Sequence, residues 1–252
     1  MLASWTRAIL LQVAHPLIAA GVADHSGFRA SAAASVVRLH HTVRAMLHLT
    51  FGSVSDQARA IDGIRAIHRR VNGRTRAAAG PFPAGTRYSA EDADLVLWVH
   101  FTLLDSAVLA YQSLVAPLSI EERDAYCRDT AWIAVALGAA DAAVPRTWAD
   151  LQHRLVSVLS SSTLAVGDDA RVISRAILHT RLSWMLPLSG RINARLTGGW
   201  LPAGVRAQYG LDWSEDHERQ FLRLVQRIRQ VRRHLPPAIA LWRTARQSPH
   251  VV

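Results

Sequence analysis

The sequence predicts an all-α fold in which a single domain, residues 1–252, forms a multi-helix bundle. Apolar residues recur at helical spacing along almost the whole chain. Alanine and leucine dominate a composition that is 50% hydrophobic, and both residues favour helix. No run of alternating β-branched residues is long enough to predict a sheet, and no repeat or low-complexity linker divides the chain. A chain of this length can therefore bury one large core.

The N-terminal segment predicts a buried helix over residues 4–23, with a kink or break near Pro16, because proline cannot continue the helical hydrogen bonds. This apolar stretch resembles a signal peptide, but Gln12, His15 and Pro16 interrupt it and there is only one early positive charge. It is also too short and too polar to cross a bilayer, which takes about 20 apolar residues. We therefore expect no transmembrane segment here.

In the next part of the chain, the predicted helices are separated by residues that typically end a helix. Residues 24–28 predict a turn, and residues 30–50 predict a helix that Gly52 ends. Residues 53–56 have N-cap character and open a third helix, which the pair Asn72-Gly73 is expected to end. Residues 74–88 contain several glycines and prolines and predict the longest loop.

The remaining helices are predicted mainly from their caps. Ser89-Ala-Glu-Asp92 resembles a capping box and starts a long apolar helix to about Pro117. Ser119-Ile-Glu-Glu-Arg123 starts another, to about Leu137. Further helices are expected at 146–160, 168–180, 200–208 and 214–234, with a last one after Pro236-Pro237.

The charge is basic, with a formal net charge of +10 and arginine in every one of the 29 Lys/Arg positions. The absence of lysine excludes a lysine Schiff base and a Walker-type phosphate lysine. A net positive charge favours nucleic acid or an anionic surface as a partner. The arginines are spread along the chain, however, and no basic run is interleaved with aromatic residues, so we expect no nucleic-acid partner.

Cys127 is the only cysteine, which excludes an intrachain disulfide framework, a zinc-finger set and a covalent c-type haem attachment. It fits a reducing compartment, so we expect a cytoplasmic protein. The neighbouring Arg128 would lower a thiol pKa, but the partly apolar helical setting favours a structural role for this cysteine.

Two helical faces between Arg38 and Val71 each pair arginine with histidine inside apolar sequence. Arg38, His41 and Thr42 share one face by their i, i+3 and i+4 spacing, and Arg65 and His68 share another. Burying such groups without partners costs roughly 1–3 kcal/mol each. They therefore either satisfy one another or face a ligand.

Histidine is concentrated near the N-terminus, where seven of the twelve lie in the first 100 residues. Histidine is the commonest metal ligand, yet the chain lacks the repeated Glu-x-x-His of di-iron bundles and the His-Glu-x-x-His of zincins. No two close histidines accompany a carboxylate as in a facial triad. Serine-nucleophile and dinucleotide-binding motifs are also absent. These absences leave a cofactor that supplies most of its own ligands, and haem b fits because it needs only one or two side chains.

The ordered motifs of the chain resemble the MpaB-type oxygenase family, which includes the latex-clearing rubber oxygenases. The resemblance covers nearly the whole chain and rests on these segments: 10–28 (Leu-Leu-Gln-Val-Ala-His-Pro onward), Arg38-Leu-His-His-Thr42, Phe51-Gly52, Ile67-His-Arg-Arg-Val-Asn-Gly73, Tyr88-Ser-Ala90, Leu97-Trp-Val-His-Phe-Thr-Leu-Leu-Asp-Ser106, Leu201-Pro202 and Gln208-Tyr-Gly-Leu-Asp-Trp213.

The resemblance implies an all-α haem b protein with a buried cofactor pocket. His68, in its Arg-x-x-His setting with Arg65, would be the proximal iron ligand. The family's distal Arg-x-x-Lys-Thr motif matches Arg38, His41 and Thr42, with histidine in place of lysine. His41 would either ligate iron from the distal side or stay off it and hydrogen-bond to bound dioxygen, with His40 as a neighbouring imidazole. Arg38 would supply positive charge toward bound oxygen or a haem propionate.

Three other histidines of the motif set carry open alternatives. His15 either caps carbonyls freed at the Pro16 kink or has a functional role. His25, beside Asp24, is a candidate acid–base pair near the pocket. His100, on one helix with Trp98 and Asp105, either packs against the haem or holds helices together.

The sequence therefore favours a haem b-dependent oxygenase that uses dioxygen on a small apolar substrate, olefinic or isoprenoid in kind. The alternative is a non-catalytic helical protein that binds haem or a lipophile. A basic helical nucleic-acid binder is a third and weaker hypothesis.

Overall fold

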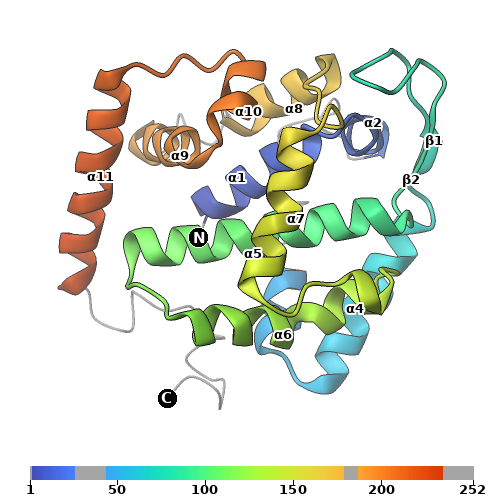
Figure 1. Cartoon of the computed structure of the whole chain (residues 1–252), viewed down its shortest axis with the longest axis horizontal. Helices are drawn as coiled ribbons and strands as arrows, with labels where there is room; N and C mark the ends of the chain where they lie inside the picture. The colour runs from blue at the N-terminus through green and yellow to red at the C-terminus, as the bar shows by residue number, and fades with distance from the viewer. Residues whose placement is uncertain (1, 26–43, 179–186, 235–252) are drawn as a thin grey trace.

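Helix α5 (Ala93–Leu114) runs through the centre of the fold, and several of the other described helices pack against it (Figure 1). The computed structural model describes residues 2–25, 44–178 and 187–234. Besides α5 it contains α1 (Leu2–Val13), α2 (Pro16–His25), a helical stretch at 44–51, α4 (Val54–His68), β1 (Asn72–Arg74), β2 (Arg87–Ser89), α6 (Ile120–Ala136), a short 3-10 helix (Asp141–Ala143), α7 (Trp148–Ser160), α8 (Asp168–Leu178), α9 (Pro187–Trp200), α10 (Ala203–Gln208) and α11 (Glu215–Arg233).

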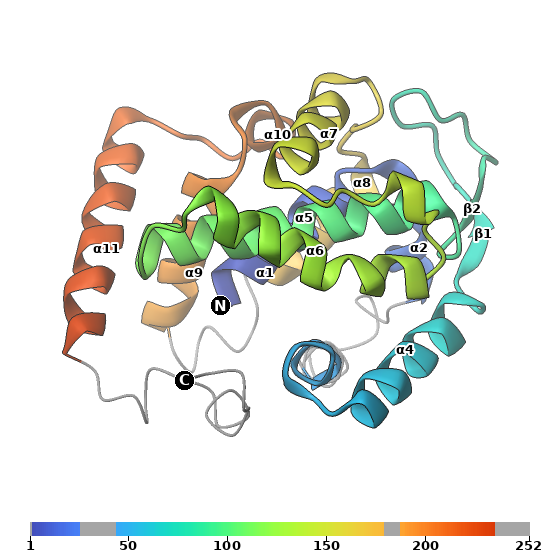
Figure 2. The same cartoon turned by 60° about the horizontal axis from the view of Figure 1, so that its bottom comes forward.

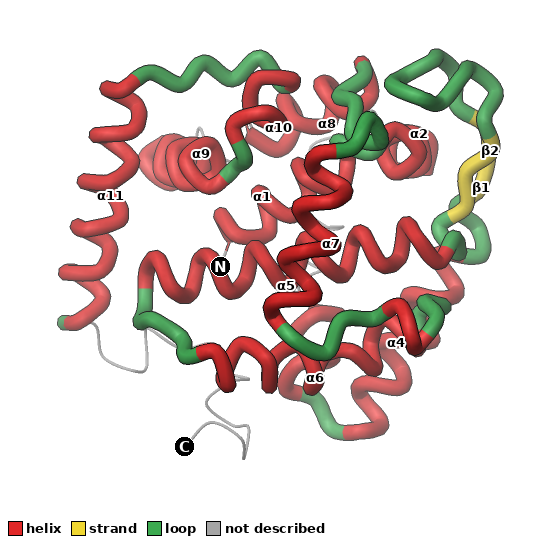
Figure 3. The backbone as a smooth tube through the Cα atoms, viewed as in Figure 1, coloured by secondary structure: helices red, strands yellow, loops and turns green. Residues whose placement is uncertain are grey.

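The described chain is mostly α-helical, which confirms the predicted fold class (Figure 3). The main core cluster joins apolar side chains of α1, α5 and α8, including Leu10, Phe101 and Ile173. A second cluster packs α11 against α9 and the far end of α5 through Phe221 and Trp200. Burial of this kind contributes roughly 25 cal/mol for each Å² of apolar surface removed from water.

The predicted break at Pro16 is present, and α1 and α2 meet there at an angle of 110°. Near the break, two main-chain carbonyls at the end of α1 accept hydrogen bonds from distant side chains, and the Leu10 carbonyl also accepts the Ala14 amide (3.1 Å). The Trp98 indole donates to the Leu11 carbonyl (3.1 Å), and the Tyr209 hydroxyl donates to the Leu10 carbonyl (2.7 Å). The kinked helix is therefore held in place by α5 and by the end of α10.

A buried ion pair crosses the centre of the bundle. The Arg7 guanidinium of α1 lies 2.7 Å from the Asp105 carboxylate of α5. Arg7 also donates to the Ser106 hydroxyl (2.6 Å) and to the Trp200 carbonyl (2.8 Å), and Gln152 of α7 donates to Asp105 (2.7 Å). This polar cluster connects α1, α5 and α7 with the end of α9.

Helix α5 is long and apolar enough to cross a membrane by length and composition, and the bent α1–α2 pair passes the same test if taken as one span. In α5, 67% of the apolar window is buried inside the fold, against α1, α6 and α7. It therefore has the character of a core helix.

Several predicted helix starts are confirmed by their caps. Ser53, Ser119 and Ser214 each form a capping box at the start of α4, α6 and α11. The start of α5 was predicted wrongly, because Asp92 caps it and Ser89 belongs to β2.

The prediction of no sheet was wrong in one place. Residues after α4 form a two-stranded antiparallel hairpin in which Gly73 pairs with Tyr88. Helix α4 ends at His68, before the predicted stop at Asn72-Gly73. Helix α2 continues through His25, so the first two residues of the turn expected at 24–28 are helical, and the other three lie outside the described residues.

Helix α9 was missed, and the helix predicted over 200–208 is α10 alone, which follows Pro202. Glycine disfavours helix, so Gly198 and Gly199 argued against α9 in the sequence. Close packing explains why both positions are glycine. A Cβ at Gly198 would come within 2.7 Å of Trp213, and one at Gly199 within 2.3 Å of Phe221.

Candidate functional site

Two of the predicted haem-site residues, Arg65 and His68, lie on α4, one turn apart. Arg38, His41 and Thr42, with the neighbouring His40, lie outside the described residues. The structure therefore describes only the predicted proximal side. The helical stretch 44–51 and the cap at Ser53 lead the chain directly into α4.

His68 occupies the last turn of α4 and is partly buried. Its Nδ1 atom is fully buried and has no hydrogen-bond partner among the described residues. Burial lowers the pKa of the His68 imidazole, and the Glu91 carboxylate offsets part of that effect. Burial therefore favours the neutral form of the ring, which is the form that binds a metal ion.

The chain around His68 is fixed to α2 by the β1–β2 hairpin. The Val71 amide donates to the His68 carbonyl (2.9 Å), and the Ala90 amide donates to the Val71 carbonyl (2.9 Å). The His25 ring lies 3.2 Å from the Asn72 carbonyl through Nε2. These bonds hold the end of α4 against the beginning of α5 and the end of α2.

A second connection in this region runs through Tyr88. Its hydroxyl donates to Asp24 (2.8 Å), and Arg76 makes an ion pair with the same carboxylate. Burial, followed by the Asp24 hydrogen bond, raises the pKa of Tyr88 to about 12. Asp24 therefore accepts the hydrogen bond of Tyr88 and pairs with Arg76. These contacts do not include the proposed His25–Asp24 acid–base pair.

Arg65 is exposed and makes no ion pair with a described residue. Its guanidinium is thus available on the same helix face as His68. A guanidinium in that position can bind a carboxylate through two parallel hydrogen bonds.

His100 is a second buried histidine with an orphaned ring nitrogen. It is 5% exposed, its Nε2 has no partner among the described residues, and burial lowers its pKa to about 4. Trp98 and Thr102 of α5 bond to α1, and Asp105 pairs with Arg7 there. Helical spacing places His100 on the opposite side of α5. Trp98 and Asp105 hold helices together, while the structure leaves His100 without such a role.

His15 has a structural role at the α1–α2 break. Its Nδ1 accepts a hydrogen bond from the Leu17 amide (3.3 Å), so it caps an amide and not the carbonyls expected from the sequence. The ring packs 5.2 Å from that of Phe82, centroid to centroid. Burial lowers the pKa of His15 to about 4.

Cys127 is fully buried beside Leu104 and Leu151. Burial raises the pKa of its thiol to about 11, and nearby Asp124 adds to this more than Arg128 subtracts. The thiolate is the reactive form, so this cysteine packs as a small apolar residue, as the sequence predicts.

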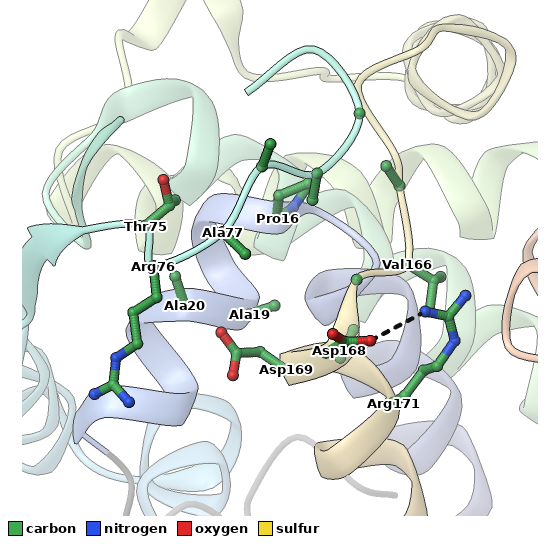
Figure 4. A pocket seen from close by; sticks show the side chains of 16 residues that line it. Pro16, Ala19, Ala20, Thr75, Arg76, Ala77, Val166, Asp168, Asp169 and Arg171 are labelled. Atoms are coloured by element: carbon green, nitrogen blue, oxygen red, sulfur yellow. Dashed lines mark ion pairs between the residues drawn. The ribbon is translucent and has the colours of Figure 1, made fainter. Parts of the chain in front are cut away.

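A groove of about 440 Å³ opens between α2, the loop after β1 and the start of α8 (Figure 4). Alanines line much of it, and Arg76, Asp169 and Arg171 stand at its edges. None of the predicted haem-site residues lines this groove. Among the described residues, no three His, Cys, Asp or Glu side chains gather as a metal site. A cofactor that takes one ligand from His68 is compatible with that arrangement.

Comparison with known proteins gives one family. The family model for "ER-bound oxygenase mpaB/B'/Rubber oxygenase, catalytic domain" matches residues 1–230 of the chain. No curated protein and no solved structure matches.

Proposed function

The chain belongs to the mpaB/rubber oxygenase catalytic-domain family, and from this membership we propose that it is a haem b-dependent oxygenase acting on an apolar, olefinic or isoprenoid, substrate. The family match supports oxygenase activity itself. The observation that supports haem is His68, whose neutral imidazole has a buried Nδ1 without a partner. A buried polar atom left unsatisfied costs roughly 1–3 kcal/mol, and binding a cofactor would remove that cost.

In this proposal His68 is the residue that would hold the haem iron. Arg65 pairs with a haem propionate, because its guanidinium shares the helix face of His68 and has no ion-pair partner among the described residues. The haem, when bound, supplies the redox-active iron that activates dioxygen.

The distal side is assigned to Arg38, His41 and Thr42. Arg38 directs positive charge toward the place where negative charge develops. Thr42 offers a hydroxyl hydrogen bond. His41 would donate or accept a proton near neutral pH if it stays free of the iron, and would be a second residue holding the haem if it binds the iron. We further propose a cytoplasmic location, with no thiol chemistry required of Cys127.

The cofactor is tested by the absorption spectrum of protein purified from haem-supplemented cells. We expect a Soret band at stoichiometric loading, and none would refute the haem assignment. His68→Ala should lose the haem, and added imidazole should restore the band by filling the vacated ligand position. His153→Ala, at an exposed position of α7, is the matched control and should load normally.

The role of His41 is tested with dithionite and carbon monoxide. Carbon monoxide binding to the reduced protein shows an open sixth position. Its absence, together with its appearance in His41→Ala, identifies His41 as a distal ligand.

Oxygen consumption separates an oxygenase from a protein that only binds haem or a lipophile. The oxygenase consumes dioxygen in proportion to an added olefin, and the oxidised product appears by mass spectrometry. Ligand-stabilised melting without any oxygen consumption across a series of olefins would favour the binding protein.

A further inference from the structure

The positive charge of the chain is concentrated at its C-terminal end. Residues 219–252 contain eight of the 29 arginines and none of the 19 acidic residues. This stretch therefore carries eight of the ten net positive charges. Arginines are spread along the whole chain, but the acidic residues stop at Glu218, so the arginines after it have no acidic neighbours in the sequence that follows to balance them.

Helix α11 carries six of these eight arginines, and four of the six are exposed. One face of the helix packs on α9 and the end of α5 through residues such as Phe221, Val225 and Ile228. The opposite face carries an outer row of exposed arginines, which consists of Arg219, Arg223, Arg227 and Arg233. Their spacing places them within about a third of the helix circumference. Figures 1 and 2 show α11 along one edge of the molecule. Because the opposite face packs on α9 and α5, the outer row lies on the exposed side of the helix.

Most of the outer row has no partner among the described residues. Arg219 lies 3.6 Å from Glu215 and 3.6 Å from Asp216 in the first turn. Arg223, Arg227 and Arg233 make no ion pair with any described residue. A row of like charges on one helix repels itself, which costs a few tenths of a kcal/mol for each i, i+4 pair. An anionic partner would relieve that repulsion.

We propose that the outer row of α11 binds an anionic lipid bilayer surface. Arginines near such a surface are attracted by the negative potential of the headgroups. Leu222 and Val231, which are 50% and 59% exposed, flank the row and can enter the headgroup region.

A nucleic-acid partner fits this face less well. The arginines could contact the phosphates of a nucleic acid, because that interaction is electrostatic. The exposed aliphatic side chains beside them would gain no favourable interaction with a charged phosphate backbone. The outer row also carries no aromatic side chain on which a base could stack. Membrane binding here is independent of the oxygenase proposal, since it needs neither cofactor nor substrate.

Vesicle sedimentation tests the proposal on the full-length protein. Vesicles of phosphatidylcholine are compared with vesicles in which a fraction of the lipid is phosphatidylglycerol, at low and high sodium chloride. We expect binding only to the anionic vesicles, and a strong decrease at high salt because the charges are exposed. The triple variant R223Q/R227Q/R233Q should lose about fivefold in partitioning for each arginine, or roughly two orders of magnitude.

The matched control is R87Q/R128Q/R175Q, which removes the same charge from three exposed arginines on β2, α6 and α8. It should lose much less than the α11 variant, and both should melt near the parent. Equal losses in the two variants, salt-insensitive binding, or no binding to anionic vesicles would overturn the proposal. Binding to a short random duplex without binding to vesicles would overturn it as well and would assign the face to nucleic acid.

Discussion

Replacing Asp105 by asparagine removes one charge from the buried ion pair that joins α1 to α5. The side chains of Arg7 and Asp105 are only 5% and 10% exposed, so water cannot replace the lost carboxylate. The guanidinium of Arg7 stays charged, because arginine does not lose its proton inside proteins. It keeps its hydrogen bonds to Ser106 and to the Trp200 carbonyl, but these neutral acceptors do not balance the charge.

Breaking a buried pair from one side costs about 3–5 kcal/mol. The two retained hydrogen bonds place the expected loss at the lower end, about 3 kcal/mol. For a chain of this size each kcal/mol moves the melting temperature by about 2–4 °C, so Asp105→Asn should lower it by about 6–12 °C.

Urea unfolding followed by circular dichroism measures this loss. The matched control is Asp150→Asn, whose carboxylate pairs with Arg154 on the surface of α7, and it should cost less than about 1 kcal/mol. The double variant R7M/D105L replaces both charges by apolar groups and should lie closer to the parent than Asp105→Asn does. A loss in Asp105→Asn no larger than in the control would refute the reasoning.

Three further outcomes follow from the structure. Gly73→Ala should destabilise the protein by about 1–3 kcal/mol, because the added Cβ would lie 2.5 Å from the Tyr88 hydroxyl. Gly63→Ala should instead stabilise α4 slightly, because nothing lies within 4 Å of the added Cβ and alanine favours helix. Thermal melts of the two variants test this difference. Cys127 should react with a thiol reagent at pH 8 only after unfolding, since burial raises its pKa to about 11, and rapid labelling of the native protein would contradict this. The pKa of His100 is lowered from 6.5 to about 4, so the unfolded state binds its proton first, and stability should fall as the pH drops from about 6.5 toward 4. His100→Leu should reduce that dependence in melts recorded across this range without abolishing it, because the pKa of His15 is lowered to about 4 as well, and an unchanged slope would assign the whole effect to other groups.

The fold was predictable where local chemistry decides it. The capping boxes at Ser53, Ser119 and Ser214 are short-range patterns, and each one begins a helix as predicted. Helix α9 was not predictable in this way, because Gly198 and Gly199 lower helix propensity and are explained only by the aromatic rings of α11 packed on them. The β1–β2 hairpin was missed because each strand has three residues, too few for an alternating pattern.

The candidate site was predictable in part. His68 was named from its motif, and the structure adds that its Nδ1 is buried without a described partner. The roles of His15 and His25 depend on contacts with Leu17 and Asn72, and pairing across a kink or a hairpin does not follow from residue types. The isolation of His100 likewise depends on which side of α5 faces α1, a property of helix packing.

The sparse packing of helix α4 offers a way to detect cofactor binding. Only Ile61 of its fifteen residues is buried, and α4 packs little against the other described helices. Its hydrogen bonds should therefore open without global unfolding, and its amides should exchange with deuterium early in the apo protein. A ligand bound through His68 would suppress this local opening of the α4 hydrogen bonds. The exchange rate of α4 amides should then report loading directly, while the amides of α5 keep the protection of the whole fold.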